Sequence, residues 1–479
     1  MKGISDGLIV VVKSDCPTCT LILPALEQLD RSEECLTLLC QDGLGPFGRL
    51  SQLVDDSDLE RSFLLKIEAV PTLIRWQDGQ ETDRLVGWQR EEWRAFTGLT
   101  DLGTELPAYR PGCGAKNVEP DLALKLEAKF RADRLRSRRV DLAPLEDDIE
   151  ACFDRDWSDG LPVVPPTPAR VLAMLKGTSR DPGDLLGEVP PNMGKCTVEK
   201  AAINAVMSGC LPQHFHIVLA AVEAALDEAF CLHGILATTY FSGPAIIVNG
   251  PAAKAAGMNW GINALGQGCR ANATIGRALQ LIVRNVGGGK PGQVDRAVLG
   301  NPGKYSFCFA ENQVDSPWEP LSVERGFPSE ASTVTVFAAD GVQAVVDQAS
   351  RNPESMARSF AACLRTVAHP KLAGMADALL VVSPEHGKVF ERAGWKKDRL
   401  REELDQLLTL DGEELARGYG GIDEGMPPAA CEGKVSKFRS GGLLIVHAGG
   451  PAGLFSAVIG GWLASGPKGS QPVTREIEA

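Results

Sequence analysis

The chain has 479 residues, of which 44% are hydrophobic and 23% charged, and these proportions are typical of a globular protein with more than one domain. No apolar run approaches the roughly 18 residues that a membrane span needs, and the apolar stretch near the N-terminus is too short for a signal peptide. The formal charge of -13 opposes binding to a phosphate backbone. We therefore expect a cytoplasmic protein with no membrane or nucleic-acid partner, whose 13 cysteines are mostly reduced.

The first 100 residues alternate between strand-like and helix-like segments. A β-branched run at residues 8–12 predicts a buried strand, and a CxxC motif made of Cys16 and Cys19 follows it at the start of a predicted helix. The elements expected after this helix are a strand at 36–39, a helix at 49–65, a strand from 70 to 76, a turn at 78–79, a strand at 83–86 and a helix at 89–96.

This order of elements, the CxxC motif and the sequence Val70, Pro71, Thr72 before the hairpin resemble the thioredoxin family over residues 1–101. The resemblance implies an α/β fold, an exposed attacking thiol at Cys16, a buried resolving thiol at Cys19, and a cis-proline at Pro71 that lies against their redox-active disulfide. A helix N-terminus stabilises a thiolate, which agrees with these roles.

Two features depart from the thioredoxin pattern. Asp15 replaces the aromatic residue expected before Cys16, and its charge should oppose thiolate formation. The first strand is wholly apolar, so it lacks the buried acid that moves protons in thioredoxins. A thioredoxin fold whose CxxC is idle or forms half of a zinc site is therefore the alternative interpretation.

Residues 102–148 contain prolines and a run of basic residues, which predicts a linker with a solvated helix. Cys113 lies in this region between two glycines. It has two interpretations, an incidental exposed cysteine, which we favour, and a third redox thiol that relays electrons.

Residues 149–479 contain four apolar segments that are each followed by a turn and a helix-like stretch, which predicts an α/β domain with repeated strand-turn-helix units and partly parallel strands. The strands are expected at residues 245–248, 333–337, 378–382 and 443–446. The helix after the second strand is expected to reach residue 349, and the helix after the fourth strand is expected at 455–462. Ligands bind at the carboxyl ends of such strands. The candidates at these ends are Asn249, Asp340, Glu385, His386 and His447.

The segment from 258 to 326 is dense in glycines, asparagines and charged residues, which favours a binding site for a small polar substrate. The candidate substrate-binding residues are Arg270, Asn272, Asn249, Lys304, Glu311, Asn312 and His233. The glycines at 266–268 do not match a dinucleotide motif, so we expect no nucleotide cofactor. Arg270 and the start of the following helix are instead expected to hold a small anion.

Two cysteines in this segment are candidate catalytic thiols. Cys269 precedes Arg270, and Cys308 lies near Lys304, so that a cation could lower the pKa of either thiol. We prefer Cys308 because Glu311 and Asn312 bring further polar groups near it. A buried structural thiol is the alternative for both cysteines.

A soft-metal site can be assembled from Cys210, His214, His216, Cys231 and His233, but their spacing matches no tight ligand pattern. His214 and His216 can instead cap the helix that follows them. We therefore expect no metal and no cofactor other than the Cys16–Cys19 disulfide.

The motif at residues 156–167, together with residues 270–274 and 304–312, resembles an uncharacterised bacterial family associated with small UGSC-type selenoproteins. This resemblance points toward thiol or selenol metabolism.

The first hypothesis for the function is an oxidoreductase in which the CxxC module reduces a cysteine or cysteine adduct of the large domain. The alternatives are a carbon-heteroatom lyase or metal-dependent enzyme, and a non-enzymatic adaptor for a partner thiol or selenol redox protein. Each of these hypotheses is compatible with a homo-oligomer.

Overall fold

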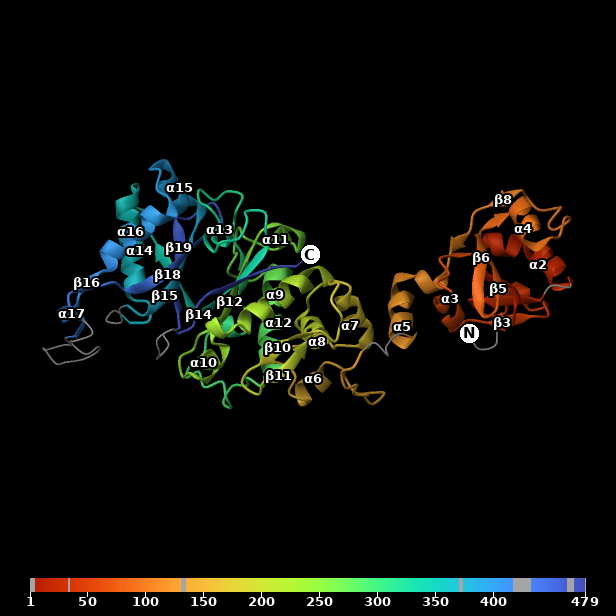
Figure 1. Cartoon of the computed structure of the whole chain (residues 1–479), viewed down its shortest axis with the longest axis horizontal. Coiled ribbons are helices and arrows are strands. Elements are labelled where there is room, and N and C mark those ends of the chain that lie inside the picture. The colour runs from red at the N-terminus through yellow and green to blue at the C-terminus, as the bar shows by residue number, and fades with distance from the viewer. Residues whose placement is uncertain are drawn as a thin grey trace. The chain divides into compact units, whose positions relative to one another are not determined.

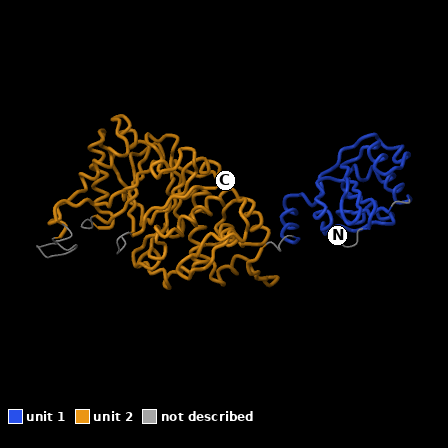
Figure 2. The backbone as a smooth tube through the Cα atoms, viewed as in Figure 1, with its two compact units in different colours: residues 1–134 blue, residues 135–479 orange. Residues whose placement is uncertain are grey.

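The computed structural model describes residues 5–32, 35–130, 135–369, 374–416, 432–462 and 469–478. The chain divides into two compact units, residues 1–134 and residues 135–479, which we call the first unit and the second unit (Figure 2). Each unit has its own buried hydrophobic clusters. Both units mix helices with strands, so the protein is an α/β protein.

The first unit is built on a mixed sheet with the strand order β3-β2-β1-β5-β6 (Figure 1). Strand β1 is parallel to β2 and antiparallel to β5, and the apolar residues of β1 are buried on both sides. The strands are β1 (Gly7–Val12), β2 (Leu36–Cys40), β3 (Leu53–Asp55), β4 (Ala69–Val70), β5 (Thr72–Gln77), β6 (Gln80–Val86) and β7 (Trp88–Gln89).

The helices of the first unit are α1 (Pro17–Leu21), α2 (Leu23–Asp30), α3 (Glu60–Leu64), α4 (Arg90–Thr97) and α5 (Pro120–Phe130). The helix expected over 49–65 is wrong, because this segment contains β3 and only the short α3. The buried carboxylate of Asp56 accepts hydrogen bonds from the backbone N–H groups of Arg61 and Ser62, and these bonds start α3 late.

The linker expected over residues 102–148 is also wrong in its first part. Strand β8 (Tyr109–Arg110) pairs with β7, and β9 (Cys113–Gly114) pairs with β4, so this segment completes the first unit. The second unit begins before residue 149, because the backbone N–H groups of Arg136 and Ser137 donate to the buried carboxylate of Glu199.

The second unit is organised around one curved mixed sheet with the strand order β13-β12-β14-β19-β15-β18, and β20 also pairs with β14 (Figure 1). Parallel pairs join β12 to β13 and β15 to β18, whereas the other pairs are antiparallel. The strands are β12 (Gly243–Asn249), β13 (Cys308–Ala310), β14 (Thr333–Val346), β15 (Ala376–Val382), β18 (Phe438–His447), β19 (Phe455–Gly461) and β20 (Val473–Glu476).

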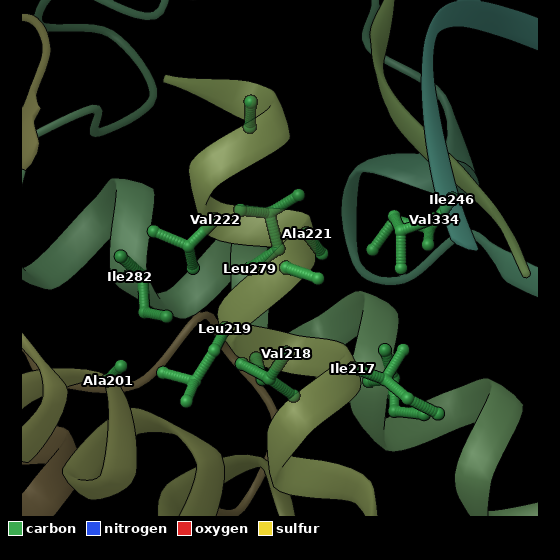
Figure 3. Packing of buried hydrophobic residues seen from close by; sticks show 14 of the residues in the cluster. Ala201, Ile217, Val218, Leu219, Ala221, Val222, Ile246, Leu279, Ile282 and Val334 are labelled. Carbon is green, nitrogen blue, oxygen red and sulfur yellow. The ribbon is translucent and has the colours of Figure 1, made fainter. Parts of the chain in front are cut away.

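Helices α9 and α12 cover one face of this sheet, and α8 packs against these two helices. Figure 3 shows Val222 of α9 on the side of Ile282 of α12, and Ala221 of α9 on the side of Ile246 of β12 and Val334 of β14. The first helices of the unit are α6 (Glu150–Asp154), α7 (Pro168–Leu175), α8 (Val198–Ser208), α9 (Phe215–Ala225), α10 (Leu232–Ala237), α11 (Pro251–Ala255) and α12 (Arg270–Asn285).

A second group of helices packs on β15 and β18, where Phe360 of α14 and Leu400 of α16 join their core. These later helices are α13 (Leu321–Glu324), α14 (Pro353–Arg365), α15 (Pro384–Arg392), α16 (Lys397–Leu408) and α17 (Gly412–Ala416). Two small hairpins complete the unit, formed by β10 (Leu185–Val189) with β11 (Gly194–Thr197) and β16 (Leu410–Asp411) with β17 (Lys434–Val435). None of the helices in these described parts of the chain is long and apolar enough to cross a membrane.

The side chains show that the sheet is curled. Ile246 and Val248 of β12 point into the cluster beneath α9, whereas Ala245 and Ile247 point to the other face. There they share a cluster with Leu444 and Val446 of β18, although β12 and β18 are far apart in the strand order. The inner face of the sheet therefore closes on itself and brings the ends of distant strands together.

Only part of the expected strand-turn-helix repeat is present. Strands β12 and β15 are followed by α11 and α15, as expected. The expected turn at Asp340 is wrong because β14 continues through it as one long strand, and the expected helix over 455–462 is wrong because β19 occupies it. Strand β19 is paired on both sides, by β14 and by β15, and residues 342–346 of β14 pair with β19, so strand pairing satisfies the backbone polar groups of both segments.

Candidate functional site

Cys16 and Cys19 meet at the start of α1 in the first unit. Cys16 is the N-cap residue of this helix, and its sulfur accepts a hydrogen bond from the backbone N–H of Cys19 at 3.2 Å. The Cys16 thiol also lies 3.6 Å from the carbonyl oxygen of Val70. This contact places the loop before β5 against Cys16, and the Val70–Pro71 peptide bond in that loop is cis, as expected.

The two thiols have opposite tendencies to ionise. The hydrogen bond with the Cys19 side chain lowers the pKa of Cys16 to about 5, although burial opposes this shift, and a hydrogen bond with the Cys113 side chain adds to it. Burial raises the pKa of Cys19 far above its ordinary value. Asp15, whose charge is expected to oppose thiolate formation, is exposed, and its carboxylate pairs with Lys13 at 3.3 Å.

The expectation of an exposed Cys16 is wrong, since this residue is only 1% exposed. Residues 109–114, which we call the Cys113 segment, pack against it. Cys113 lies opposite Val70 in the β4–β9 pair, and its thiol interacts with that of Cys16. The Thr18 hydroxyl, within the CxxC motif, donates to the carbonyl oxygen of Pro111 at 2.8 Å. The sequence predicts a linker around Cys113. The two glycines that flank Cys113 are the feature of the sequence that could have indicated close packing of this backbone against another segment.

In the second unit, Cys269, Cys308 and Cys210 form what we call the second-unit thiol cluster. Cys269 is half-buried and lies at the N-cap of α12. Cys308 is buried in β13, and burial raises the pKa of its thiol well above the ordinary value. The cation expected to activate Cys308 does not do so, because the ammonium group of Lys304 pairs with Asp295 at 2.8 Å.

Arg270 and Asn272 do not form the anion site expected at the start of α12. The exposed Arg270 donates from Nε to the carbonyl oxygen of Gly209 at 2.9 Å. The buried Asn272 amide holds the preceding loop, since it accepts from the N–H of Asn259 and donates to the carbonyl oxygens of Asn259 and Ala264. Its polar atoms are therefore used within the fold.

Other expected substrate-binding residues converge on what we call the strand-end cluster, made of Asn249, Glu311, Asn312, His447 and Lys397. The carboxylate of Glu311 accepts from Asn249 Nδ2 at 2.6 Å and lies 3.6 Å from the ammonium group of Lys397. Its side chain is fully buried, and that of Lys397 is 4% exposed. Sequence reasoning missed Lys397, which is the buried lysine at the start of an otherwise amphipathic helix.

His447 connects β18 to the end of β13. Its backbone carbonyl oxygen accepts from the N–H of Asn312 at 2.7 Å, and its Nδ1 lies 3.2 Å from the carbonyl oxygen of Asn312. Burial lowers the pKa of His447, so its ring is neutral at pH 7. The buried atoms His447 Nε2 and Asn249 Oδ1 lack hydrogen-bond partners among the residues that the structure describes.

The remaining candidates at strand ends lie outside this cluster. Both ring nitrogens of His386 are used, one with Ser456 and one with the backbone of Asp347. Glu385 accepts from the N–H of Leu454 in the loop before β19. Asp340 lies at the opposite end of β12, because β14 runs antiparallel to it.

The residues considered for a metal site are dispersed. His214 Nδ1 accepts the N–H of Leu211 and caps the short turn at 212–214, but no side-chain hydrogen bond caps α9 itself. His233 is exposed on α10. Within the described ranges, no group of three or more His, Cys, Asp or Glu side chains is placed to hold a metal ion.

A cavity of about 840 Å³ lies in the second unit, and none of the candidate substrate-binding residues predicted from the sequence lines it. The motif at residues 156–167 supplies part of its wall through Asp156, Trp157, Pro165 and Thr167. Cys152, Lys200 and Lys290 also line it. Its mixed apolar and charged wall is suited to a small polar molecule.

Three comparisons with known proteins bear on the identity of this chain. No family model matches it, no curated protein matches it, and no solved structure matches it. The function is therefore argued from the geometry of the thiol site and of the strand-end cluster.

Proposed function

We propose that this chain is a thiol-disulfide oxidoreductase whose first unit is a thioredoxin-like module. The observation that carries the proposal is the asymmetry of the CxxC pair, in which Cys16 has a pKa of about 5 and Cys19 has a pKa raised by burial. A thiolate is the nucleophile in disulfide exchange, so Cys16 is the attacking residue and Cys19 the resolving residue. The position of both at the start of α1, beside the cis-proline Pro71, supports these roles.

The exchange takes two steps. The Cys16 thiolate attacks one sulfur of a disulfide, the S–S bond of that disulfide breaks, and the departing sulfur takes up a proton. Cys19 then gives up its proton and attacks Cys16, which releases the second substrate sulfur as a thiol and leaves the Cys16–Cys19 disulfide. Two electrons pass from the CxxC pair to the substrate, and an external dithiol returns them.

We place the second-unit partner of this chemistry at Cys269 rather than at Cys308. Cys269 is half-buried at the N-terminus of a 16-residue helix, whereas Cys308 is buried and its pKa is raised. The thiol of Cys269 donates a hydrogen bond to the carbonyl oxygen of Gly257 at 3.3 Å, and its partial exposure makes it accessible to a reagent or substrate. A cysteine adduct of a small polar substrate on Cys269 is the species that the CxxC module would reduce.

The proposal is tested by the ultraviolet absorbance of the Cys16 thiolate. The difference in absorbance between the reduced wild-type protein and a Cys16→Ser variant should titrate with a midpoint of about 5. Cys40→Ser serves as the matched control, because burial raises the pKa of Cys40 to about 12 and its removal should leave the absorbance unchanged near pH 5.

A midpoint above pH 8 would remove the main support for an attacking thiol at Cys16. If Cys16 and Cys19 also failed to form a disulfide in a dithiothreitol redox buffer, a non-enzymatic adaptor would become the better hypothesis. One equivalent of zinc that is lost on replacing either cysteine would favour the metal-dependent alternative.

A further inference from the structure

The first unit contains an activated thiol that solvent does not reach. Cys16 is ionised near neutral pH, yet the residue is 1% exposed. Disulfide exchange requires the attacking sulfur to approach the target sulfur in line, so a buried thiolate cannot meet a disulfide carried by a large molecule. Some other group must connect Cys16 to its substrate, or the residues that cover it must move.

Cys113 is in the position to make this connection. Its thiol interacts with the thiol of Cys16, and it is partly exposed while Cys16 is not. Burial and the neighbouring Cys16 raise the pKa of Cys113, so it remains a protonated thiol beside the Cys16 thiolate. The pair therefore consists of a nucleophile and an adjacent neutral sulfur.

The Cys113 segment is held in place by both backbone and side-chain bonds. Strands β4 and β9 pair, with Val70 opposite Cys113, and Ala115 N–H donates to the carbonyl oxygen of Glu68 at 3.0 Å. Beyond the segment, the N–H of Lys116 donates to Gln41 Oε1 at 2.9 Å. Together with the Thr18 to Pro111 bond, these contacts anchor the segment on either side of Cys113.

We propose that Cys113 is a third exchange thiol, which carries the disulfide-bonded substrate on the same chain and presents it to Cys16. This inference rests on the proposed function and adds to it the residue through which the CxxC pair reaches its substrate. The substrate class is a thiol-containing molecule joined to Cys113 through a mixed disulfide.

The proposed exchange uses three cysteines of the first unit, Cys16, Cys19 and Cys113. Cys113 first gives up its proton and attacks one sulfur of a substrate disulfide, whose other sulfur leaves as a thiol. The Cys16 thiolate then attacks Cys113 Sγ, the bond from Cys113 to the substrate sulfur breaks, and this second part of the substrate leaves as a thiol after taking up a proton. Cys19 then loses its proton and attacks Cys16, and Cys113 leaves as a thiol. Cys16 and Cys19 supply the two electrons, and an external dithiol reduces their disulfide afterwards.

The intermediate of this sequence is a Cys16–Cys113 disulfide, which Cys19 normally resolves. A full-length Cys19→Ser protein treated with oxidised glutathione should therefore accumulate this disulfide. It is detected by mass spectrometry of peptides after acid quenching and alkylation. Cys16 found only with glutathione, or only with another cysteine such as Cys35, would overturn the proposal.

A kinetic measurement separates a relay from simple covering of Cys16 by the Cys113 segment. With 5,5'-dithiobis(2-nitrobenzoate) as the bulky disulfide probe, Cys113→Ser should slow the reaction of the CxxC pair by about tenfold or more, because access limits exchange at a buried thiol. Cys35→Ser is the matched control, since Cys35 is an exposed thiol outside this site. An unchanged or faster reaction in Cys113→Ser means that the segment only covers Cys16.

The wild-type protein distinguishes failure of this inference from failure of the proposed function. If the Cys16–Cys19 disulfide forms in a dithiothreitol redox buffer but Cys19→Ser yields no Cys16–Cys113 disulfide, only the relay is wrong. If the wild-type disulfide does not form, the proposed function is wrong as well. Formation of the Cys16–Cys19 disulfide in Cys113→Ser shows that the variant is folded around the CxxC motif.

Discussion

Cys16 and Cys19 are three residues apart, yet only the first is placed to ionise. Cys16 lies at the helix N-cap, where it accepts the N–H of Cys19, whereas Cys19 lies inside the core of the first unit. Burial penalises the charged form of both thiols, but only Cys16 has enough hydrogen-bond donors to reverse the penalty. The pKa values of the two thiols therefore differ because Cys19 lies one helical turn further into the core than Cys16.

The same contrast applies to the cysteines of the second unit and leads to a prediction about their labelling. Iodoacetamide should modify Cys269 in the native protein at pH 8 and should leave Cys308 unmodified. Cys308 is 6% exposed and burial raises its pKa, so it is protonated and inaccessible under these conditions.

Peptide mass spectrometry reads the labelling at each cysteine. The unfolded protein in urea is the control, and both cysteines should be modified there. Modification of Cys308 in the native protein at the rate of Cys269 would restore Cys308 as the candidate exchange thiol.

At the scale of elements, the strand-end cluster shows how the curled sheet positions polar groups. Glu311 follows β13, Asn249 ends β12 and His447 ends β18, and α16 adds Lys397 from outside the sheet. The ammonium group of Lys397 also lies 3.1 Å from Glu324 of α13. Buried charges require partners, and here ion pairs and hydrogen bonds to Glu311 and Lys397 join five elements.

Removal of Lys397 should destabilise this junction. In Lys397→Met the carboxylate of Glu311 keeps its hydrogen bonds from Asn249 and from the N–H of Leu321, but it loses its buried cation. We expect the free energy of unfolding of the second unit to fall by about 3 to 5 kcal/mol, as for other broken buried ion pairs.

Urea unfolding followed by pulse proteolysis measures this change for the second unit. Lys396→Met is the matched control, because the neighbouring Lys396 is exposed at the start of the same helix. The control should change the stability by less than about 0.5 kcal/mol. Equal effects of the two substitutions would show that the ion-pair network does not support the junction.

At the scale of the whole molecule, the two units have separate cores. The core of the first unit is formed by β1, β2 and β5 with α2, and it includes Trp88 and Trp93. The main core of the second unit is formed by α8, α9 and α12 against β12 and β14. A unit with its own core is expected to fold independently.

Residues 1–134 expressed alone should therefore fold and keep the thiol site. Cys16, Cys19, Pro71 and Cys113 all belong to this fragment, so the Cys16 thiolate should titrate with the same midpoint of about 5 as in the full chain. A fragment that ends at residue 108 is the comparison, because it lacks Cys113 and β9 and should titrate at a higher pH. Identical midpoints in both fragments would mean that the Cys113 segment does not act on Cys16.

Local signals predicted many elements of the fold. The apolar runs at residues 8–12, 36–39 and 378–382 form strands β1, β2 and β15, because a buried strand needs only a short run of apolar residues. The turn at 78–79 forms the β5–β6 hairpin as expected. The sequence predicts a helix over 455–462, and only the pairing of residues 455–461 with β14 and β15 makes them a strand.

The sequence by itself determined the CxxC motif at a helix start, the polar residues near strand ends and the division of the chain into parts with different patterns. The tertiary structure decided which of these residues meet. Cys113 reaches Cys16 through strand pairing with Val70, and Glu311 reaches His447 across 136 residues of chain. Periodicity and propensity act over about one element, whereas these contacts depend on how the sheets pair and curl, which no local pattern encodes.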